Sequence, residues 1–284
     1  MELGKVGIWW NIPWLVDETS LDVAAEMEAL GYSALWRGGG FKSGLSTSFE
    51  RLLAATTHVP VVSGIVSIWQ TSPEELSKAV ADLDNRYPER FLLGLGTSHE
   101  AMVKNYTRPY GHMVSYLDAL DTAGPVVAKN RRVLAALGPR MLELARERTA
   151  GAHPYFVPVE HTARARGILG PDPLLAPEVT VVLESDPTKA RDLARTFTAA
   201  FLGLPDYTNN LRSLGFGDND LAGGGSDRLV DAVVCWGDLN AIAARVREHF
   251  EAGADHVCIQ VVSTSQRSFP LAEYRELAPA LLAA

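Results

Sequence analysis

Two glycines at the end of one predicted strand and a histidine just past it could form part of a ligand site. Residues 94–99 read Gly-Leu-Gly-Thr-Ser-His. The third glycine of the dinucleotide fingerprint GxGxxG is absent, so this segment is not a Rossmann turn. Glycines at a strand end instead let the backbone and a flat ligand approach each other closely. His99 lies just past the strand end, where it is either an acid/base group or a loop histidine with an ordinary hydrogen bond.

A second candidate segment leads from a predicted strand into a helix that begins near Pro158. It covers residues 151–162 and reads GAHPYFVPVEHT. Exposed amides at such a turn can form an anion site, so phosphate binding is one interpretation and a plain strand-to-helix corner is the other. A third run, residues 223–227 (GGGSD), lacks the lysine of a P-loop, and we expect a flexible or helix-initiating turn there.

Tryptophans also gather at predicted strand ends. They stand at positions 9, 10, 14, 36 and 69. A flat aromatic ligand would suit such a surface, and ordinary packing of large side chains is the alternative. The residues alone therefore predict a wide, aromatic, glycine-lined pocket and do not identify a reaction.

Several kinds of chemistry have no support in the sequence. The seven histidines form no HExxH or other metal-ligand spacing, so we expect no metal site. No serine occupies a GxSxG nucleophile elbow, and no predicted strand end carries the lysine of an aldolase-type lyase. Cys235 and Cys258 are the only cysteines, too few for a disulfide framework, which favours a reducing compartment.

The charge balance excludes further partners. Lys and Arg total 26 against 34 Asp and Glu, a net charge of −8, and no basic stripe offsets it. We therefore expect neither a nucleic-acid nor a membrane partner. The N-terminal residues 1–14 lack a basic segment followed by a long apolar run, so we expect no signal peptide and a cytoplasmic protein.

The elements that must position these residues alternate between strand and helix along the whole chain. Eight strands are predicted, at residues 6–10, 32–36, 59–66, 91–96, 132–137, 153–157, 179–183 and 256–262. Helices between them have start signals, the clearest being Ser72-Pro73-Glu74-Glu75, a capping box with proline at the first helical position. Residues 98–130, with a helix over 113–122, and residues 203–230 interrupt the alternation as loop insertions.

This alternation predicts an α/β fold. Eight strands with loop insertions favour a (β/α)8 TIM barrel, formed by residues 1–284 as a single domain, with its active site at the carboxyl ends of the strands. A doubly wound open sheet is the alternative.

Together, several segments resemble the luciferase-like monooxygenase family, and in particular its subgroup of coenzyme F420-dependent oxidoreductases. The resemblance extends over nearly the whole chain. It is carried by residues 30–36 (LGYSALW), 61–69 (VVSGIVSIW), 90–99 (RFLLGLGTSH), 151–155 (GAHPY), 160–164 (EHTAR) and 223–231 (GGGSDRLVD). It implies the bacterial luciferase-like form of the TIM barrel.

The resemblance also implies positions for a bound cofactor. A strained non-proline cis peptide within Ser63, Gly64 and Ile65 would form a bulge behind the middle ring of the cofactor. Gly96, Thr97 and Ser98 would line the ring or the ribityl chain, and Gly151, Ala152 and His153 would lie near the phosphate. Trp9 and Trp36 would complete the aromatic wall.

One position departs from the subgroup. Many deazaflavin-dependent relatives have a histidine or aspartate at the end of the second strand, whereas this chain reads Trp36-Arg37-Gly38-Gly39-Gly40. Arg37 would then meet a phosphate or an anionic substrate, or face solvent. This departure keeps FMN open as an alternative to coenzyme F420.

The implied function is an oxidoreductase that transfers a hydride between C5 of the deazaflavin and an unknown small organic substrate. His99 is the first choice for the proton donor or acceptor, followed by Tyr106 and Tyr110. The alternatives are an FMN-dependent monooxygenase that uses reduced flavin and O2, and a non-catalytic flavin-binding relative. We further expect a homodimer. If the protein is an FMN-dependent monooxygenase, we also expect a partner enzyme that reduces the flavin.

Overall fold

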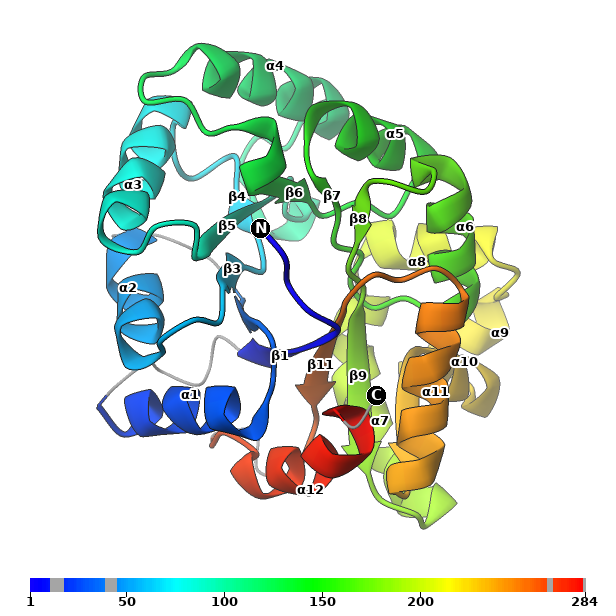
Figure 1. Ribbon diagram of the computed structural model, residues 1–284. Helices are drawn as coiled ribbons and strands as arrows, with labels where there is room; N and C mark the ends of the chain where they lie inside the picture. The colour runs from blue at the N-terminus through cyan, green and yellow to red at the C-terminus, as the bar shows by residue number, and fades with distance from the viewer. Residues whose placement is uncertain (11–17, 39–44, 265–267, 283–284) are drawn as a thin grey trace.

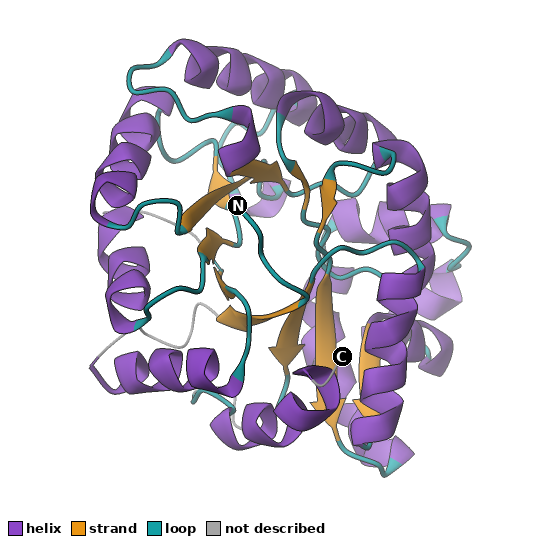
Figure 2. Ribbon diagram, in the orientation of Figure 1, coloured by secondary structure: helices purple, strands orange, loops and turns teal. Residues whose placement is uncertain are grey.

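The strands of the chain curl into a barrel, and its helices form a ring around them (Figures 1 and 2). The computed structural model describes residues 1–10, 18–38, 45–264 and 268–282. Trp14, Gly39 and Gly40, which the sequence analysis singled out, lie outside the described residues. No helix in the described ranges is long and apolar enough to cross a membrane.

The strands are β1 (Val6–Trp10), β2 (Leu35–Arg37), β3 (Val61–Ser63), β4 (Val66–Ser67), β5 (Phe91–Gly96), β6 (Arg132–Leu134), β7 (Gly151–Ala152), β8 (Leu174–Leu175), β9 (Glu178–Leu183), β10 (Val234–Gly237) and β11 (Val257–Val261). The α-helices are α1 (Glu18–Leu30), α2 (Leu45–Ala55), α3 (Pro73–Arg86), α4 (Pro109–Thr122), α5 (Pro139–Arg148), α6 (Val159–Leu169), α7 (Pro187–Leu202), α8 (Pro205–Ser213), α9 (Asp218–Leu221), α10 (Asp227–Val233), α11 (Leu239–Glu251) and α12 (Leu271–Leu282).

All strand pairs are parallel, and the path runs β10-β9-β11-β1-β2-β3-β5-β6-β7-β8. The segment 174–178 closes this path into a ring. Its amides donate to the carbonyls of Ala150, Ala152 and Pro154 on one side, while the carbonyls of Leu175 and Pro177 accept from Asp255 and Cys258 on the other. The expected barrel is confirmed, and the open doubly wound sheet is wrong.

Three strands differ from the prediction, and one of them, β8 at Leu174–Leu175, was not predicted. The strand expected at 153–157 is a loop, because Pro154 and Pro158 lack amides and Phe156 has a left-handed φ of 57°. β7 lies just before it, at Gly151–Ala152. β10 was not predicted; it follows α10 with no glycine or proline between them and pairs with the second half of β9.

The helix starts agree well with the sequence. Ser72 caps α3: its Oγ accepts from the Glu75 amide at 3.3 Å, and its own amide donates to Glu75 Oε2 at 3.2 Å. The glycine run 223–225 ends in a helix start, because Ser226 Oγ accepts from the Leu229 amide at the beginning of α10. The expected loop insertions contain α4, and α8 to α10.

The apolar residues form two layers, as alternation along barrel strands requires. Val6, Ile8 and Trp10 of β1 pack outward in the cluster that includes helix residues such as Met27. Trp9, between them, belongs to a smaller cluster of strand and loop residues inside the barrel. That cluster consists of Leu3, Trp9, Ala34, Trp36, Val62, Leu92, Val133, Ala176 and Cys258.

Inside the barrel, β5 approaches β3 so closely that Gly94 has no room for a side chain. A Cβ atom there would lie 2.1 Å from the Ser63 carbonyl oxygen. The Ser63 hydroxyl fixes the approach, since it accepts from the Gly94 amide at 2.7 Å and donates to the Gly94 carbonyl at 3.1 Å. The backbone on which the expected site is built is therefore held by direct contact between strands.

We predict that Gly94→Ala lowers the free energy of unfolding by about 1–3 kcal/mol or prevents folding, because the clash is with backbone that cannot rotate away. Gly167→Ala in α6 is the matched control: a Cβ added there would meet open space, and alanine favours a helix interior by about 0.5–1 kcal/mol. Chemical denaturation measures both. Equal stability of Gly94→Ala and the wild type would contradict the argument.

Candidate active site

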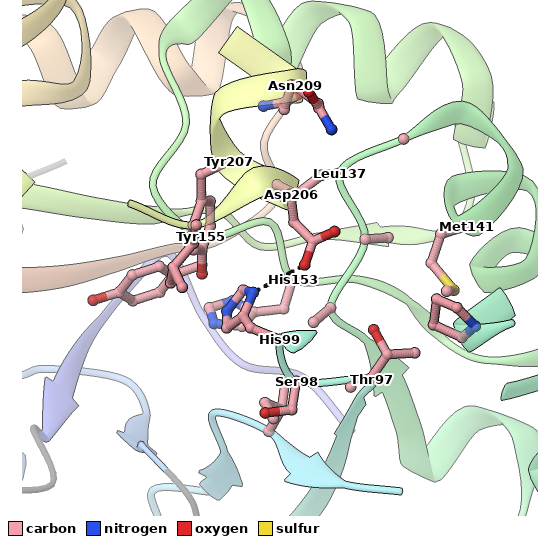
Figure 3. A pocket seen from close by; sticks show the side chains of 18 of the residues that line it. Thr97, Ser98, His99, Leu137, Met141, His153, Tyr155, Asp206, Tyr207 and Asn209 are labelled. Carbon is pink, nitrogen blue, oxygen red and sulfur yellow. Dashed lines mark hydrogen bonds and ion pairs between the residues drawn. The ribbon is translucent and has the colours of Figure 1, made fainter. Parts of the chain in front are cut away.

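A cavity of about 740 Å³ opens at the carboxyl ends of the strands. Its walls come from the end of β5, the β6–α5 loop, the loop after β7, and α8 (Figure 3). Ten of the fifteen predicted site residues line it: Trp9, Gly64, Ile65, Gly96, Thr97, Ser98, His99, Tyr106, Tyr110 and His153. The volume suits a ligand of cofactor size.

Five predicted site residues are not part of the wall. Trp36 is fully buried and donates from Nε1 to His256 Nε2 at 2.9 Å. Arg37 is buried and donates to the carbonyl of Gly38, and desolvation lowers the pKa of its guanidinium. Ser63 is engaged with Gly94, and Gly151 and Ala152 lie buried in β7. The His153 ring covers Trp36, and the contact with β5 occupies Ser63.

The tryptophans therefore play unequal roles. Trp9 lines the cavity, whereas Trp10 packs against Phe269 in the outer layer. Trp69 supports the site from behind, since its Nε1 donates to the Thr97 carbonyl at 2.6 Å. Of the described tryptophans that were singled out, Trp9 alone lines the cavity, and its other aromatic lining residues are Tyr106, Tyr110, Tyr155, Phe201 and Tyr207.

The predicted bulge in the third barrel strand is present, with a different backbone geometry. β3 ends at Ser63 and β4 begins at Val66, so Gly64 and Ile65 interrupt the strand. The expectation of a cis peptide within residues 63–65 is wrong, since the cis bond found among the described residues is Gly124–Pro125. The Gly64 amide donates to the Arg37 carbonyl at 2.7 Å, and a Cβ on Gly64 would lie 2.4 Å from the Trp9 ring.

His153 lies at the inner end of the cavity with one nitrogen engaged and one free. Its Nδ1 is 2.6 Å from the Ala176 carbonyl oxygen, so Nδ1 carries the proton and Nε2 presents a lone pair. Nε2 is buried without a hydrogen-bond partner. The ring stacks on Trp36, with centroids 4.2 Å apart, and lies 5.5 Å from Trp9. Burial lowers the pKa of His153 to about 4, so the ring is neutral at pH 7.

A neutral acceptor does not suit the phosphate expected near His153. The surrounding amides are also committed: the Gly151 amide donates to Thr149 Oγ1 and the His153 amide to the Leu134 carbonyl. Among the described residues no donor faces Nε2, which leaves it an unsatisfied buried acceptor.

Cationic groups that the sequence analysis did not select line another part of the wall. Arg140 lies on the first turn of α5 and covers the Tyr110 ring at 4.1 Å. Arg164 of α6 donates to Ser213 Oγ at 2.8 Å. Neither forms an ion pair with a carboxylate of the described chain. The signal available in the sequence was Gly138-Pro139, which starts α5 and places Arg140 in its first turn.

The predicted acid/base residues meet at the cavity wall. His99 Nδ1 lies 2.9 Å from Asp206 Oδ2 of α8, a residue that sequence reasoning missed. The Tyr106 hydroxyl contacts Thr97 Oγ1 and the Ser98 carbonyl, each at 3.4 Å, and burial raises the pKa of Tyr106. Tyr110 is half-buried beneath Arg140. Within the described residues, no group of three His, Cys, Asp or Glu side chains is arranged to hold a metal ion.

A buried carboxyl holds the loop that carries His153. Glu178 of β9 accepts from Thr180 Oγ1 at 2.6 Å and from the Phe156 amide at 3.2 Å, which fixes Phe156 in its left-handed conformation. Burial raises the pKa of Glu178 to about 7.

These buried groups predict a pH dependence of stability. Burial lowers the pKa of His153, His161 and His256 from 6.5 to about 4 and that of His249 to about 3. Between these values the unfolded chain binds protons that the folded chain does not, so acidification from pH 6.5 destabilises the fold by up to about 1.4 kcal/mol per histidine and pH unit. The raised pKa of Glu178 acts in the opposite direction between 4.5 and about 7.

Urea denaturation at about pH 7 and about pH 5 should therefore give a lower free energy of unfolding at the lower pH. In Glu178→Gln the decrease should be steeper, because the opposing group is gone. An unfolding free energy that is flat or rises on acidification would overturn this description of the buried histidines.

Comparison with known proteins agrees with this architecture. The sequence model of the luciferase-like monooxygenase family matches residues 18–125. No curated protein sequence matches the chain. Among solved structures, an F420-dependent secondary alcohol dehydrogenase in complex with an F420-acetone adduct is 14% identical, with 99% of each chain covered and a TM-score of 0.74.

Two further structures show the same fold. Coenzyme F420-dependent tetrahydromethanopterin reductase from Methanopyrus kandleri is 15% identical, with a TM-score of 0.73 over 100% of this chain and 99% of that one. The oxygenating constituent of 3,6-diketocamphane monooxygenase from Pseudomonas putida, in complex with FMN, is 13% identical, with a TM-score of 0.69 over 98% of both chains. The resemblance to the luciferase-like family is thereby supported over residues 18–125 by the sequence model, and the fold of these oxidoreductases and monooxygenases is confirmed over nearly the whole chain.

Proposed function

We propose that this protein is a coenzyme F420-dependent oxidoreductase that transfers a hydride between the deazaflavin and a small organic substrate. One observation carries the proposal: His153, which lines the cavity beside Gly64 and Gly96, has a buried, neutral acceptor, Nε2, that has no partner among the described residues. A buried acceptor without a partner costs about 1–3 kcal/mol, and a bound ligand that donates to it removes this cost.

The residues present fit a flat ring system. Gly64 and Ile65 form one edge of the wall, and a Cβ on Gly96 would lie only 3.1 Å from the Ile65 side chain, so the glycine lets that side chain pack flat against β5. Deazaflavins and flavins both carry a ring N–H and ribityl hydroxyls, either of which can donate to His153 Nε2. Trp9 and Tyr155 add aromatic surface beside it.

The remaining charges suit the anionic end of such a cofactor. Arg140 and Arg164 line the cavity without carboxylate partners in the described part of the chain, and Arg140 lies at the N-terminus of α5. Phosphate oxygens bind guanidinium groups and helix N-termini favourably. We therefore assign the phosphate to this region instead of Gly151 and Ala152.

When bound, the cofactor supplies a carbon, C5, that accepts or gives up a hydride. The protein's part is to orient the partners, exclude water and move a proton. His99 is placed to take a proton from a substrate hydroxyl, or to return one, at its Nε2. Burial keeps Tyr106 protonated, so its hydroxyl can donate a hydrogen bond to a substrate oxygen.

Coenzyme F420 is preferred over FMN on the comparison of folds. The two F420-dependent structures have TM-scores of 0.74 and 0.73, against 0.69 for the FMN-bound monooxygenase component. The two cofactors differ at ring position 5, where carbon in the deazaflavin suppresses the oxygen reactivity that flavin monooxygenases use. An assay of binding therefore separates the two branches.

Titration of the purified protein with coenzyme F420, and separately with FMN, tests the assignment through cofactor fluorescence. We expect micromolar binding of F420 and weaker binding of FMN. His153→Phe keeps a flat ring beside Trp9 and Trp36 but removes the acceptor, so it should weaken F420 binding by about tenfold. His112→Phe, an exposed ring stacked on Trp69 outside the cavity wall, is the matched control.

The outcomes of the titration distinguish the proposed function from its alternatives. Preferential FMN binding would move the protein to the oxygenase branch. Tight binding of either cofactor with no redox change across a broad substrate panel would favour a non-catalytic relative. Binding of neither, or equal affinities of His153→Phe and wild type, would refute the proposed site.

A separate prediction concerns His99. His99→Gln should lower the rate of F420-linked turnover by about 100-fold, since a positioned acid or base typically contributes about 10²–10⁴. Its affinity for F420 should stay within about twofold of the wild type, because cofactor binding rests on other residues. Equal losses of affinity and turnover would instead make His99 a binding residue.

A further inference from the structure

His99 is held by a carboxylate from a distant part of the chain. Its Nδ1 lies 2.9 Å from Oδ2 of Asp206, which stands 107 residues later on α8. Figure 3 shows the two side chains pointing toward each other from opposite sides, with His99 at the end of β5 and Asp206 on the helix.

The chemistry of this contact determines which nitrogen of His99 is free. A carboxylate only accepts, so the proton between the two residues belongs to Nδ1. In the neutral ring Nε2 is then an unprotonated acceptor. Nε2 has no hydrogen-bond partner among the described residues, and the His99 side chain lines the cavity.

Both partners have fixed backbones. Ser98 has a left-handed φ of 57°, and the His99 carbonyl accepts from the Met102 amide at 2.9 Å, so the chain turns sharply at His99. Asp206 lies in the first turn of α8, where the helix dipole stabilises a negative charge. Its neighbour Tyr207 is buried against Phe156 and Phe201 and lies 5.1 Å from the His99 ring.

Stability does not account for the pair. The side chains of His99 and Asp206 are 19% and 48% exposed, and ion pairs this accessible contribute little to folding. Orientation is the effect that remains: without Asp206 the ring could rotate or take the other tautomer, which would present N–H to the cavity in place of a lone pair.

We propose that Asp206 is a positioning residue that holds His99 in the Nδ1–H tautomer with Nε2 directed into the cavity. The proposal rests on the proposed function for the role of His99, while the tautomer itself is independent of it. Asp206 does not touch the reacting atoms and acts through the imidazole. The acidic and phenolic groups near the pair are Glu100, Tyr106 and Tyr207.

Asp206→Asn tests the proposal, because the amide keeps the shape of the side chain and can donate to Nδ1 instead of accepting from it. Long-range ¹H–¹⁵N NMR of the histidine rings, at a pH of about 8 where free imidazole is neutral, reports the tautomer directly. The His99 signals are assigned by their loss in His99→Gln. We expect Nδ1–H in the wild type and Nε2–H in Asp206→Asn.

Kinetics give the second readout. Turnover in Asp206→Asn should fall about tenfold or more while F420 affinity stays within about twofold, and Asp206→Glu should restore part of the rate. Asp218→Asn is the matched control, since Asp218 pairs with Arg212 at 3.0 Å outside the cavity wall and should change neither readout.

Each outcome decides a different point. A wild-type ring with Nε2–H, or an unchanged His99 tautomer in Asp206→Asn, would overturn the proposal. The expected change of tautomer with unaltered turnover would also overturn it, because His99 would then not need positioning. The expected tautomers in a protein that binds neither F420 nor FMN would refute the proposed function and leave the pairing intact.

Discussion

The segment 174–178 connects the architecture to the chemistry. Its amides and carbonyls bond to the β7 side and to the start of β11, and these bonds close the ring of strands. The same segment supplies the Ala176 carbonyl that accepts from His153 Nδ1. Closing the barrel therefore also fixes the tautomer of the histidine at the inner end of the cavity. Had Nδ1 found no carbonyl there, the ring could present either nitrogen to a ligand.

The cavity is divided electrostatically. Its inner end, formed by His153, Trp9 and the glycines of β5, is uncharged, because burial keeps the imidazole neutral. The charged groups, Asp206 and the arginines 140 and 164, stand on helices around it, and His99 lies beside Asp206. Such a division suits a ligand with a neutral ring and an anionic tail. It also places the proton-transfer group on a wall different from the one that the ring would contact.

The sequence predicted those parts of the fold that local patterns determine. The capping box at Ser72 and the close backbone approach at the glycines of β5 each have a local signal, and each prediction is confirmed. Local sequence patterns did not predict the loop at 153–157. Its conformation depends on Glu178, which is distant along the chain and bonds the Phe156 amide. β10 was missed because no turn residue separates it from α10.

The site was predictable to a similar extent. His99, Thr97 and Ser98 follow a recognisable strand end and line the cavity as expected. Trp36 on β2 and Trp9 on β1 both belong to the cluster inside the barrel, but the His153 ring covers Trp36. The alternation of residues along a strand does not reveal this covering. Asp206 lies on a helix within an insertion, and only the folded chain brings it to His99. Residues that act through long-range contacts were therefore the ones that sequence reasoning missed.

The most direct test of the central claim is a crystal structure of the protein with coenzyme F420. The account predicts the deazaflavin ring against Gly64 and Ile65, a ring N–H or ribityl O–H within about 3 Å of His153 Nε2, and the phosphate beside Arg140 or Arg164. A ring bound elsewhere, or His153 Nε2 left without a donor from the cofactor, would contradict it.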